Sequence, residues 1–134
     1  MEKERISYTG LTQQWISDRE TLLPVIEEVL KSGIYVGGPY IDKLESKLAS
    51  LCKTRYCIAL NSGTDALVCS LILAGVRPGD EVITPPNSFI ASTAAIAHIE
   101  AVPVFADVLE DQNIDPLSIE PVISKKTKAI IIVH

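Results

Sequence analysis

The sequence predicts an α/β fold with three layers, α-β-α, and a mainly parallel sheet at its centre. From Tyr56 onward, short apolar runs alternate with helical segments in the order β-α-β-α-β-α-β. The last run, residues 129–133, is uniformly apolar, so it is expected to be buried on both faces. Strands that alternate with helices are joined by right-handed crossovers, which place helices on both faces of a parallel sheet.

The predicted strands and helices follow from runs of apolar residues and their spacing. The strands are expected at 56–60, 81–84, 102–105 and 129–133, with Pro103 at an awkward place in the third. Residues 64–74 are apolar almost all round and predict a buried helix. Further helices are expected at 89–99 and 115–123, the last with Asp115 as its cap and Pro116 at its first position.

Two more helices are expected before the first strand. One runs from about Ser17 or Asp18 to Lys31, with Asp18 as its cap and Ser32-Gly33 at its end. Pro24 lies inside it and is expected to kink the helix or to move its start. After a turn in IYVGGPY, residues 34–40, apolar residues spaced 3, 4 and 3 apart predict a helix over residues 40–51.

The composition and net charge of the chain argue against several classes of protein. Apolar residues make up 47% of the chain and charged residues 22%, which is enough apolar material for a core. Lys and Arg number 12 and Asp and Glu 17, so the net charge is −5, which argues against sequence-independent nucleic-acid binding. Three cysteines without paired spacing favour reduced thiols over disulfides or a zinc site. The chain shows no signal-peptide core and no apolar run of about 20 residues, so a cytoplasmic protein without membrane association is expected.

The segment Asn61-Ser62-Gly63-Thr64-Asp65 lies between a predicted strand and a predicted helix. Gly63 allows close approach of a ligand to the backbone, and the first turn of the helix offers amide groups without intrahelical partners. These donors and the helix dipole favour a phosphate ester, with the hydroxyls of Ser62 and Thr64 as further donors. An ordinary capped turn without a ligand is the alternative, because the same residue types cap helices.

Phe89 follows the second predicted strand in the segment PPNSF, residues 85–89. In a parallel sheet this loop opens beside the phosphate-binding turn, and a flat aromatic side chain there can stack on a planar ring. Taken alone, core packing at the start of a helix is the commoner role for such a residue.

Other polar residues carry weaker signals. Asp107 ends a strand and either serves the site or caps a turn with Asn113 and Asp115. His134 ends the last strand, where a structural role is the commoner one. A basic run, Lys125, Lys126 and Lys128, is typical of a solvated turn.

Four motifs in order are more specific than any one of them. The segments YVGGPYIDKLESKLA, NSGTDAL, GDEVITPPNSFIAS and AVPVFADVLEDQNIDPLSIEPVISKKTKAIIIVH closely resemble the DegT/DnrJ/EryC1/StrS family. These are pyridoxal-phosphate (PLP)-dependent enzymes of fold type I that mostly aminate nucleotide-linked keto sugars, in polysaccharide or antibiotic biosynthesis. The resemblance implies an N-terminal helical segment at 1–33 and, at 34–134, an incomplete large domain like that of aspartate aminotransferase, without the small domain.

The resemblance also implies roles for particular residues. Ser62, Gly63, Thr64 and Asp65 correspond to the phosphate-binding turn, with Thr64 and the amides of Thr64 and Asp65 on the PLP phosphate. Phe89 matches the aromatic side chain that stacks on the pyridine ring. The remaining positions are expected near the substrate entrance or dimer interface: Tyr35, Gly37, Gly38 and Ser88.

In this family the Schiff-base lysine and the aspartate that pairs with the pyridine nitrogen follow a V-H-L-Y-G stretch, whose start resembles Val133-His134. Neither residue is present among the 134 residues, so we expect the chain alone to be inactive and to bind PLP weakly or not at all. The intact enzyme is expected to be a homodimer that takes an amino group from an amino acid, commonly glutamate.

Three alternatives stay open. The first is a non-catalytic PLP- or phosphate-binding or regulatory protein of the same fold. The second is a small doubly wound domain that binds a phosphorylated ligand. The third is part of a dehydratase relative in which the Schiff-base lysine is replaced. The sugar, the carbon aminated and the nucleotide are not determined by the sequence.

Overall fold

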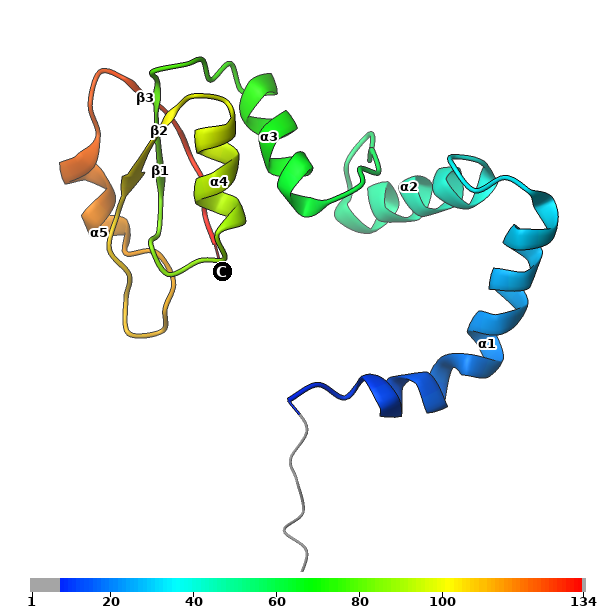
Figure 1. Ribbon diagram of the computed structural model, residues 1–134. Helices are drawn as coiled ribbons and strands as arrows, with labels where there is room; N and C mark the ends of the chain where they lie inside the picture. Colours follow the sequence, from blue (N-terminus) through cyan, green and yellow to red (C-terminus); the bar gives the residue numbers. More distant parts are fainter. Residues whose placement is uncertain (1–7, 134) are drawn as a thin grey trace, which may run out of the picture. The chain divides into compact units, whose positions relative to one another are not determined.

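The computed structural model describes residues 8–133, and the chain divides into two compact units between Ala59 and Leu60 (Figure 1). Each unit is described by itself. No helix within residues 8–133 combines the length and the apolar character needed to cross a membrane.

The first unit contains helix α1, Leu11–Ser32, which starts earlier than predicted. Its N-cap is Gly10, not Asp18, and Pro24 lies inside the helix without ending it. Proline removes only one backbone donor, and the turns on either side keep their own hydrogen bonds. The predicted end is confirmed, since Gly33 adopts a left-handed conformation with φ 68° and donates its N–H to the carbonyl of Leu30.

Helix α2, Pro39–Cys52, begins one residue before its predicted start. The preceding residues form the predicted turn, and Pro39 occupies the first helical turn, where its missing N–H costs nothing. Gly38 has φ 86°, and a Cβ there would lie 2.9 Å from Cγ2 of Ile34. Both the backbone conformation and the close contact therefore require glycine at this position.

The predicted strand at 56–60 is wrong. The segment has no ladder partner in the described chain, and the side chains of Tyr56 and Ile58 are each 76% exposed. Two hydrogen bonds hold it locally: the amide of Ala59 donates to Oε1 of Glu45 at 2.8 Å, and the carbonyl of Tyr56 accepts from Oγ1 of Thr54 at 3.0 Å. Apolar, β-branched composition favours a strand only when a neighbouring strand pairs with the backbone, and composition does not supply that neighbour.

The second unit is built on a parallel three-stranded sheet in the order β2-β1-β3. Its strands are β1 (Glu81–Thr84), β2 (Val102–Phe105) and β3 (Thr127–Ile130). Pro103 is tolerated because β2 is an edge strand. The amides of Val102 and Ala106 donate to β1 or to the turn before it, so the backbone nitrogen of Pro103, at an odd-numbered position between them, faces away from β1 and needs no hydrogen.

Helices cover both faces of the sheet, which confirms the three-layer prediction. On one face, α3 (Gly63–Leu73) and α4 (Ala91–His98) form a buried cluster with Val82. On the other face, Ile83 packs with residues of α5 (Pro116–Ile119) and of the short 3-10 helix η1 (Glu120–Val122). Val82 and Ile83 are neighbours in β1, and alternate side chains of a strand point to opposite faces.

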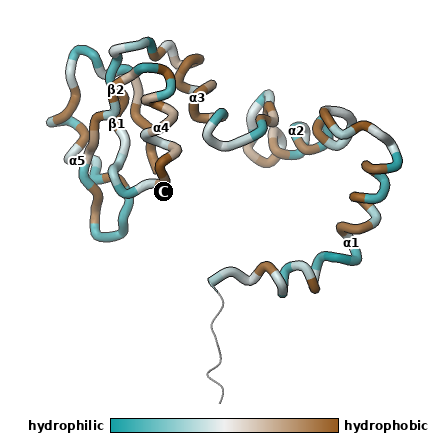
Figure 2. The backbone as a smooth tube through the Cα atoms, in the orientation of Figure 1, coloured by the Kyte–Doolittle hydropathy of each residue, from teal (hydrophilic) through white to brown (hydrophobic). Residues whose placement is uncertain are grey.

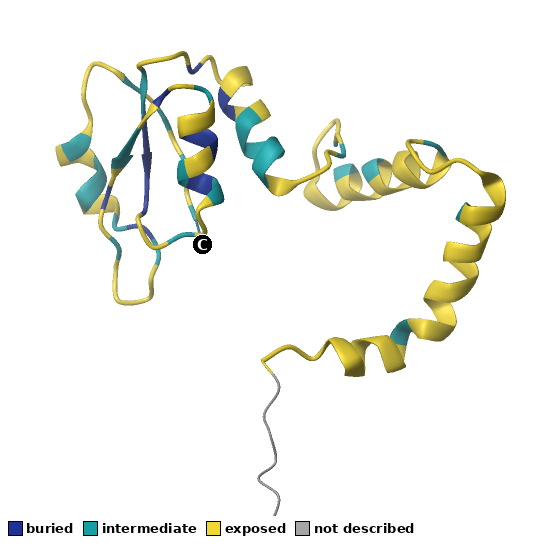
Figure 3. Ribbon diagram, viewed as in Figure 1, coloured by how far each residue is buried: buried dark blue, intermediate teal, exposed yellow. Residues whose placement is uncertain are grey.

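Burial is concentrated on β1 and the inward side of α4 (Figure 3). The predictions of a fully buried α3 and of a last strand buried on both faces are therefore wrong. Apolar residues are spread round α3 (Figure 2), but only Leu71 is buried, and Leu73 is 86% exposed. In and after β3, Ala129 and Ile131 are half-buried because they pack against the cluster that contains Val82, while Ile130 and Ile132, on the opposite face, are exposed.

Thr84, at the end of β1, carries a buried hydroxyl with no hydrogen-bond partner among the described residues. We expect Thr84→Val to raise the free energy of unfolding by about 1 kcal/mol, because the apolar isostere removes an unmet polar group at constant shape. Urea unfolding would measure the change. Thr84→Ser, which keeps the hydroxyl and deletes the methyl group, is the control and should be less stable. A loss of stability in Thr84→Val would show that the hydroxyl is hydrogen-bonded, for example to water.

Candidate functional site

The start of α3 is a capped helix terminus with unused donors. Ser62 is the N-cap, and its Oγ accepts from the amide of Asp65 at 3.1 Å, while its carbonyl accepts from Ala66 at 3.1 Å. Within residues 8–133, the amides of Gly63 and Thr64 have no acceptor. Two N–H groups and the positive end of the helix dipole are therefore available to an anion.

The surroundings of these amides leave space for a ligand. A Cβ placed on Gly63 would meet no atom within 4 Å, so the backbone is open to close approach. Gly63 is exposed and Thr64 half-buried. Ser62 Oγ uses a lone pair for the cap and keeps its hydrogen for donation. A phosphate monoester, with oxygens that only accept from such donors, fits this set.

The amide of Asp65, a predicted phosphate donor, already has a hydrogen-bond acceptor within the turn. The resemblance assigns the amide of Asp65 to the PLP phosphate, but in this structure that amide donates to Ser62 Oγ. A phosphate at this turn would rely first on Gly63 and Thr64. The assignment of Ser62, Gly63, Thr64 and Asp65 to the cofactor stays a prediction.

Phe89 lies in the loop between β1 and α4 and is 78% exposed. Its ring is therefore exposed to solvent. Core packing, the commoner role for such a residue, is not observed. Ser88, half-buried, donates from Oγ to the carbonyl of Phe89 at 3.2 Å. Stacking of Phe89 on a planar ring stays a prediction that the exposed side chain permits.

The loop that carries Phe89 and the turn at the start of α3 lie toward the same edge of the sheet. A short turn joins the end of α3 to the start of β1, so α3 runs back along the sheet and its first turn lies toward the carboxyl end of β1. The loop that carries Ser88 and Phe89 leaves that same end of β1. Ligands of parallel α/β sheets bind at this edge.

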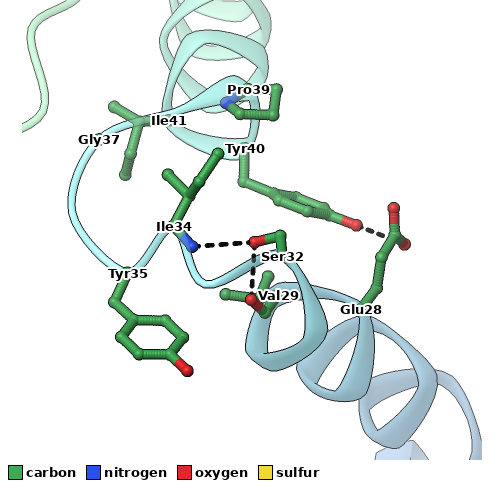
Figure 4. A pocket seen from close by; sticks show the side chains of 9 residues that line it. All are labelled: Glu28, Val29, Ser32, Ile34, Tyr35, Gly37, Pro39, Tyr40 and Ile41. Carbon is green, nitrogen blue, oxygen red and sulfur yellow. Dashed lines mark hydrogen bonds between the residues drawn. The ribbon is translucent and has the colours of Figure 1, made fainter.

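Tyr35, Gly37 and Gly38 belong to the first unit, in the turn between α1 and α2. Tyr35 and Gly37 line a mostly apolar pocket of about 220 Å³, which Glu28 and Tyr40 also line (Figure 4). The Tyr35 hydroxyl donates to the carbonyl of Leu30 at 3.3 Å. The predicted role of these residues at the substrate entrance or dimer interface stays a prediction.

A hydrogen bond from the Tyr40 hydroxyl to Glu28 Oε2, 2.7 Å long, joins two of the residues that line this pocket (Figure 4). The bond raises the pKa of Tyr40 above the ordinary value of 10.0, with smaller contributions from desolvation and the Glu28 charge. The protonated phenol is the form favoured by folding, so the link is intact below pH 10.0 and is lost as the pH rises through the folded-state pKa.

We therefore expect Glu28→Ala to lower the pKa of Tyr40 toward the ordinary value. The measurement is an NMR titration of the Tyr40 ring carbon that bears the hydroxyl. Glu27→Ala is the matched control, because Glu27 pairs with Lys31 in the same helix and does not contact Tyr40. An unchanged Tyr40 titration in Glu28→Ala would contradict the hydrogen bond.

The other polar residues that the sequence singled out contribute nothing further to the site at the start of α3. Asp107 closes a turn, which was one of its two predicted roles: its Oδ1 accepts from the amide of Val108 and its carbonyl from that of Asp115, both at 2.8 Å. Lys125, Lys126 and Lys128 are exposed, and His134 lies outside the described residues. Among residues 8–133 no group of three or more His, Cys, Asp and Glu side chains has the arrangement of a metal site, and Cys52, Cys57 and Cys69 are free thiols.

Sequence reasoning missed one contact in this region. The side-chain amide of Asn87 donates to the carbonyl and the side-chain oxygen of Gln112, at 3.0 and 3.3 Å. The two residues are 25 positions apart and match no motif, so no signal in a single sequence pairs them.

Comparison with known proteins identifies the family. The model of the DegT/DnrJ/EryC1/StrS aminotransferase family matches residues 17–134. The chain belongs to this family. The resemblance noted in the four sequence motifs is thereby confirmed, and so is the α/β fold, since the structure is similar to crystal structures of these aminotransferases.

Three relatives show the range of the DegT/DnrJ/EryC1/StrS family. A dTDP-3-amino-3,6-dideoxy-alpha-D-galactopyranose transaminase of Aneurinibacillus thermoaerophilus is 39% identical over 96% of this chain and 36% of its own length. A pleiotropic regulatory protein of Geobacillus stearothermophilus is 39% identical over 92% of the chain and 34% of its own length. NtdA of Bacillus subtilis, solved with the cofactor PMP, has a TM-score of 0.86 at 37% identity over 100% of this chain and 32% of its own. The chain thus spans about a third of the length of the curated relatives that it matches.

Proposed function

We propose that this chain supplies the phosphate-binding part of a PLP-dependent aminotransferase that acts on a nucleotide-linked keto sugar. The observation that carries the proposal is the start of α3, where two unpaired amides and open space at Gly63 suit a phosphate monoester. Membership of the family and a transaminase relative at 39% identity support the reaction class. A solved relative with bound PMP supports the cofactor.

The proposal gives the following roles to the residues, with support from the free amides and the exposed ring. Gly63, Thr64 and the hydroxyl of Ser62 bind the phosphate, and Phe89 covers one face of the ring. When bound, PLP supplies an electron-accepting ring that stabilises negative charge at the substrate carbon. The donor is an amino acid, glutamate in the commonest case for the family, and the working enzyme is a homodimer.

The 134 residues include neither the lysine nor the aspartate that the family places after the V-H-L-Y-G stretch. We therefore propose that this polypeptide, expressed alone, binds PLP weakly and does not transfer amino groups. The test has two arms: PLP titration of the 134-residue chain, followed by fluorescence, and an amino-transfer assay on the product of the whole reading frame. The assay uses glutamate and a dTDP-linked 3-keto sugar, and detects the amino sugar by mass.

Amino-sugar formation by the whole product supports the proposal. Binding of PLP without amino transfer to any keto sugar would overturn the reaction class. Absence of binding in both products would overturn the cofactor assignment itself.

A second candidate is a non-catalytic PLP- or phosphate-binding regulator. The pleiotropic regulatory protein at 39% identity favours it. A whole product that binds PLP, lacks transfer activity and has no lysine after the V-H-L-Y-G stretch would support this candidate.

A further inference from the structure

The loop that presents Ser88 and Phe89 is tied to a distant part of the second unit at one point. The side-chain nitrogen of Asn87 donates both to the main-chain oxygen and to Oε1 of Gln112, at 3.0 and 3.3 Å. Asn87 precedes the predicted ring-stacking residue by two positions. Gln112 lies in the connection between β2 and α5, on a separate segment of the chain.

Gln112 is held in an unusual conformation. Its φ is 70°, in the left-handed region that favours glycine. Its amide donates to the carbonyl of Leu109 at 2.9 Å, and its side-chain nitrogen lies 3.4 Å from the carbonyl of Glu110. Residues in this conformation persist where several interactions fix them together, and such positions cluster at functional sites.

The surrounding turn is itself well connected. The amide of Leu109 donates to the carbonyl of Asn113 at 2.9 Å, and Val108 and Ile114 form an antiparallel bridge. Ile114 is 7% exposed and belongs to the core cluster that contains Ile83. Residues 108–114 therefore form an anchored hairpin, and Gln112 offers two acceptors from it to the neighbouring loop.

Phe89, in contrast, has little packing of its own. Its side chain is 78% exposed, and the loop before it contains two prolines that cannot donate backbone hydrogen bonds. Within residues 8–133, the Asn87 side chain provides the only side-chain hydrogen bonds between residues 85–90 and the hairpin.

We propose that Asn87 and Gln112 are positioning residues, which fix the loop that presents Ser88 and Phe89 at the carboxyl edge of the sheet. The hydrogen bond from the Asn87 side chain to the main-chain oxygen of Gln112 restricts the loop before a ligand arrives, so the ring of Phe89 is already in place. This role rests on the proposed cofactor site for its use in binding, but the restriction of the loop is a property of the chain alone.

The primary test measures the loop without any ligand. In the full chain, ¹⁵N order parameters of residues 87–90 are expected near 0.85 for the wild type and below about 0.6 for Asn87→Ala. Asn113→Ala is the matched control, because Asn113 uses its side chain on Asp111 in the same hairpin and does not reach the loop. Gln112→Gly keeps the main-chain acceptor and suits φ 70°, so its loop should stay ordered.

A second readout links the loop to binding. If the freed loop occupies its bound arrangement about a tenth of the time, Asn87→Ala binds PLP about tenfold more weakly. Asn113→Ala should bind like the wild type, and the unfolding midpoints of both variants should stay within about 3 °C of it. A loss of affinity without a change in midpoint distinguishes positioning from a general loss of stability.

The outcomes separate the two proposals. Equal order parameters in Asn87→Ala and the wild type would overturn the positioning role, whatever binds. Equal PLP affinity in the two, with the loop loosened, would overturn its use in binding. Absence of PLP binding by the wild-type product of the whole reading frame would count against the proposed function, while the order parameters would still decide whether Asn87 fixes the loop.

Discussion

Ile83→Ala is expected to lower the free energy of unfolding by about 2–5 kcal/mol, the largest effect on stability of any substitution considered for this chain. Ile83 is completely buried at the centre of β1, the middle strand of the sheet. It packs with Ala106 and Ile114 in one of the two core clusters. Truncation removes apolar contacts and leaves a cavity that the neighbouring strands cannot close without losing their ladder.

Urea unfolding of the second unit, followed by NMR signals of its core methyl groups, measures this effect. The matched control is Ile132→Ala, because Ile132 is 59% exposed and should change the free energy by less than about 0.5 kcal/mol. Similar losses in both variants would show that Ile132 is buried in solution. A loss below about 1 kcal/mol in Ile83→Ala would contradict the position of Ile83 in the core.

Gly63→Pro is expected to weaken PLP binding by about 1.5–3 kcal/mol, which is about 10- to 150-fold in Kd. The substitution deletes one of the two unpaired amides at the start of α3 and should leave the helix intact. Gly63 is the first helical residue, where proline is favoured, and Ser62 before it is extended, with φ −153° and ψ 157°. No atom lies within 4 Å of the position a Cβ would take.

Gly63→Ala separates the amide from the added bulk. It keeps the N–H and places only a methyl group in open space, so its Kd should lie within about twofold of the wild type. The probes are PLP and inorganic phosphate, titrated into the same protein, with circular dichroism to confirm that α3 persists. Equal losses in both variants would indicate a steric effect, and wild-type binding in Gly63→Pro would show that this amide does not bind the phosphate.

The two substitutions test different parts of the protein. Ile83 supports the sheet, whereas Gly63 offers a backbone donor and makes no contribution to the core. We expect Gly63→Pro to change the free energy of unfolding by less than about 0.5 kcal/mol, since proline at the first helical position retains the other hydrogen bonds of the turn. Affinity and stability should therefore change independently.

Several elements have local signals, and these were predicted correctly from the amino-acid sequence. Alternating strands and helices predicted the parallel sheet, and Asp115 with Pro116 predicted the start of α5, where Asp115 Oδ1 accepts from the amide of Leu117 at 2.9 Å. Gly33 marked the end of α1. Such caps and turns depend on a few neighbouring residues, so a single sequence contains the whole interaction. The four motifs likewise identified the family.

Which apolar residues are buried, and which polar side chains contact each other, became known only from the folded chain. The segment at 56–60 has strand composition but no pairing partner in this structure, and α3 is apolar almost all round yet buries only Leu71. The contact between Asn87 and Gln112 joins positions 25 residues apart. Burial and strand pairing depend on which surfaces other parts of the fold bring together. That is a long-range property, and hydrophobic periodicity along one segment does not encode it.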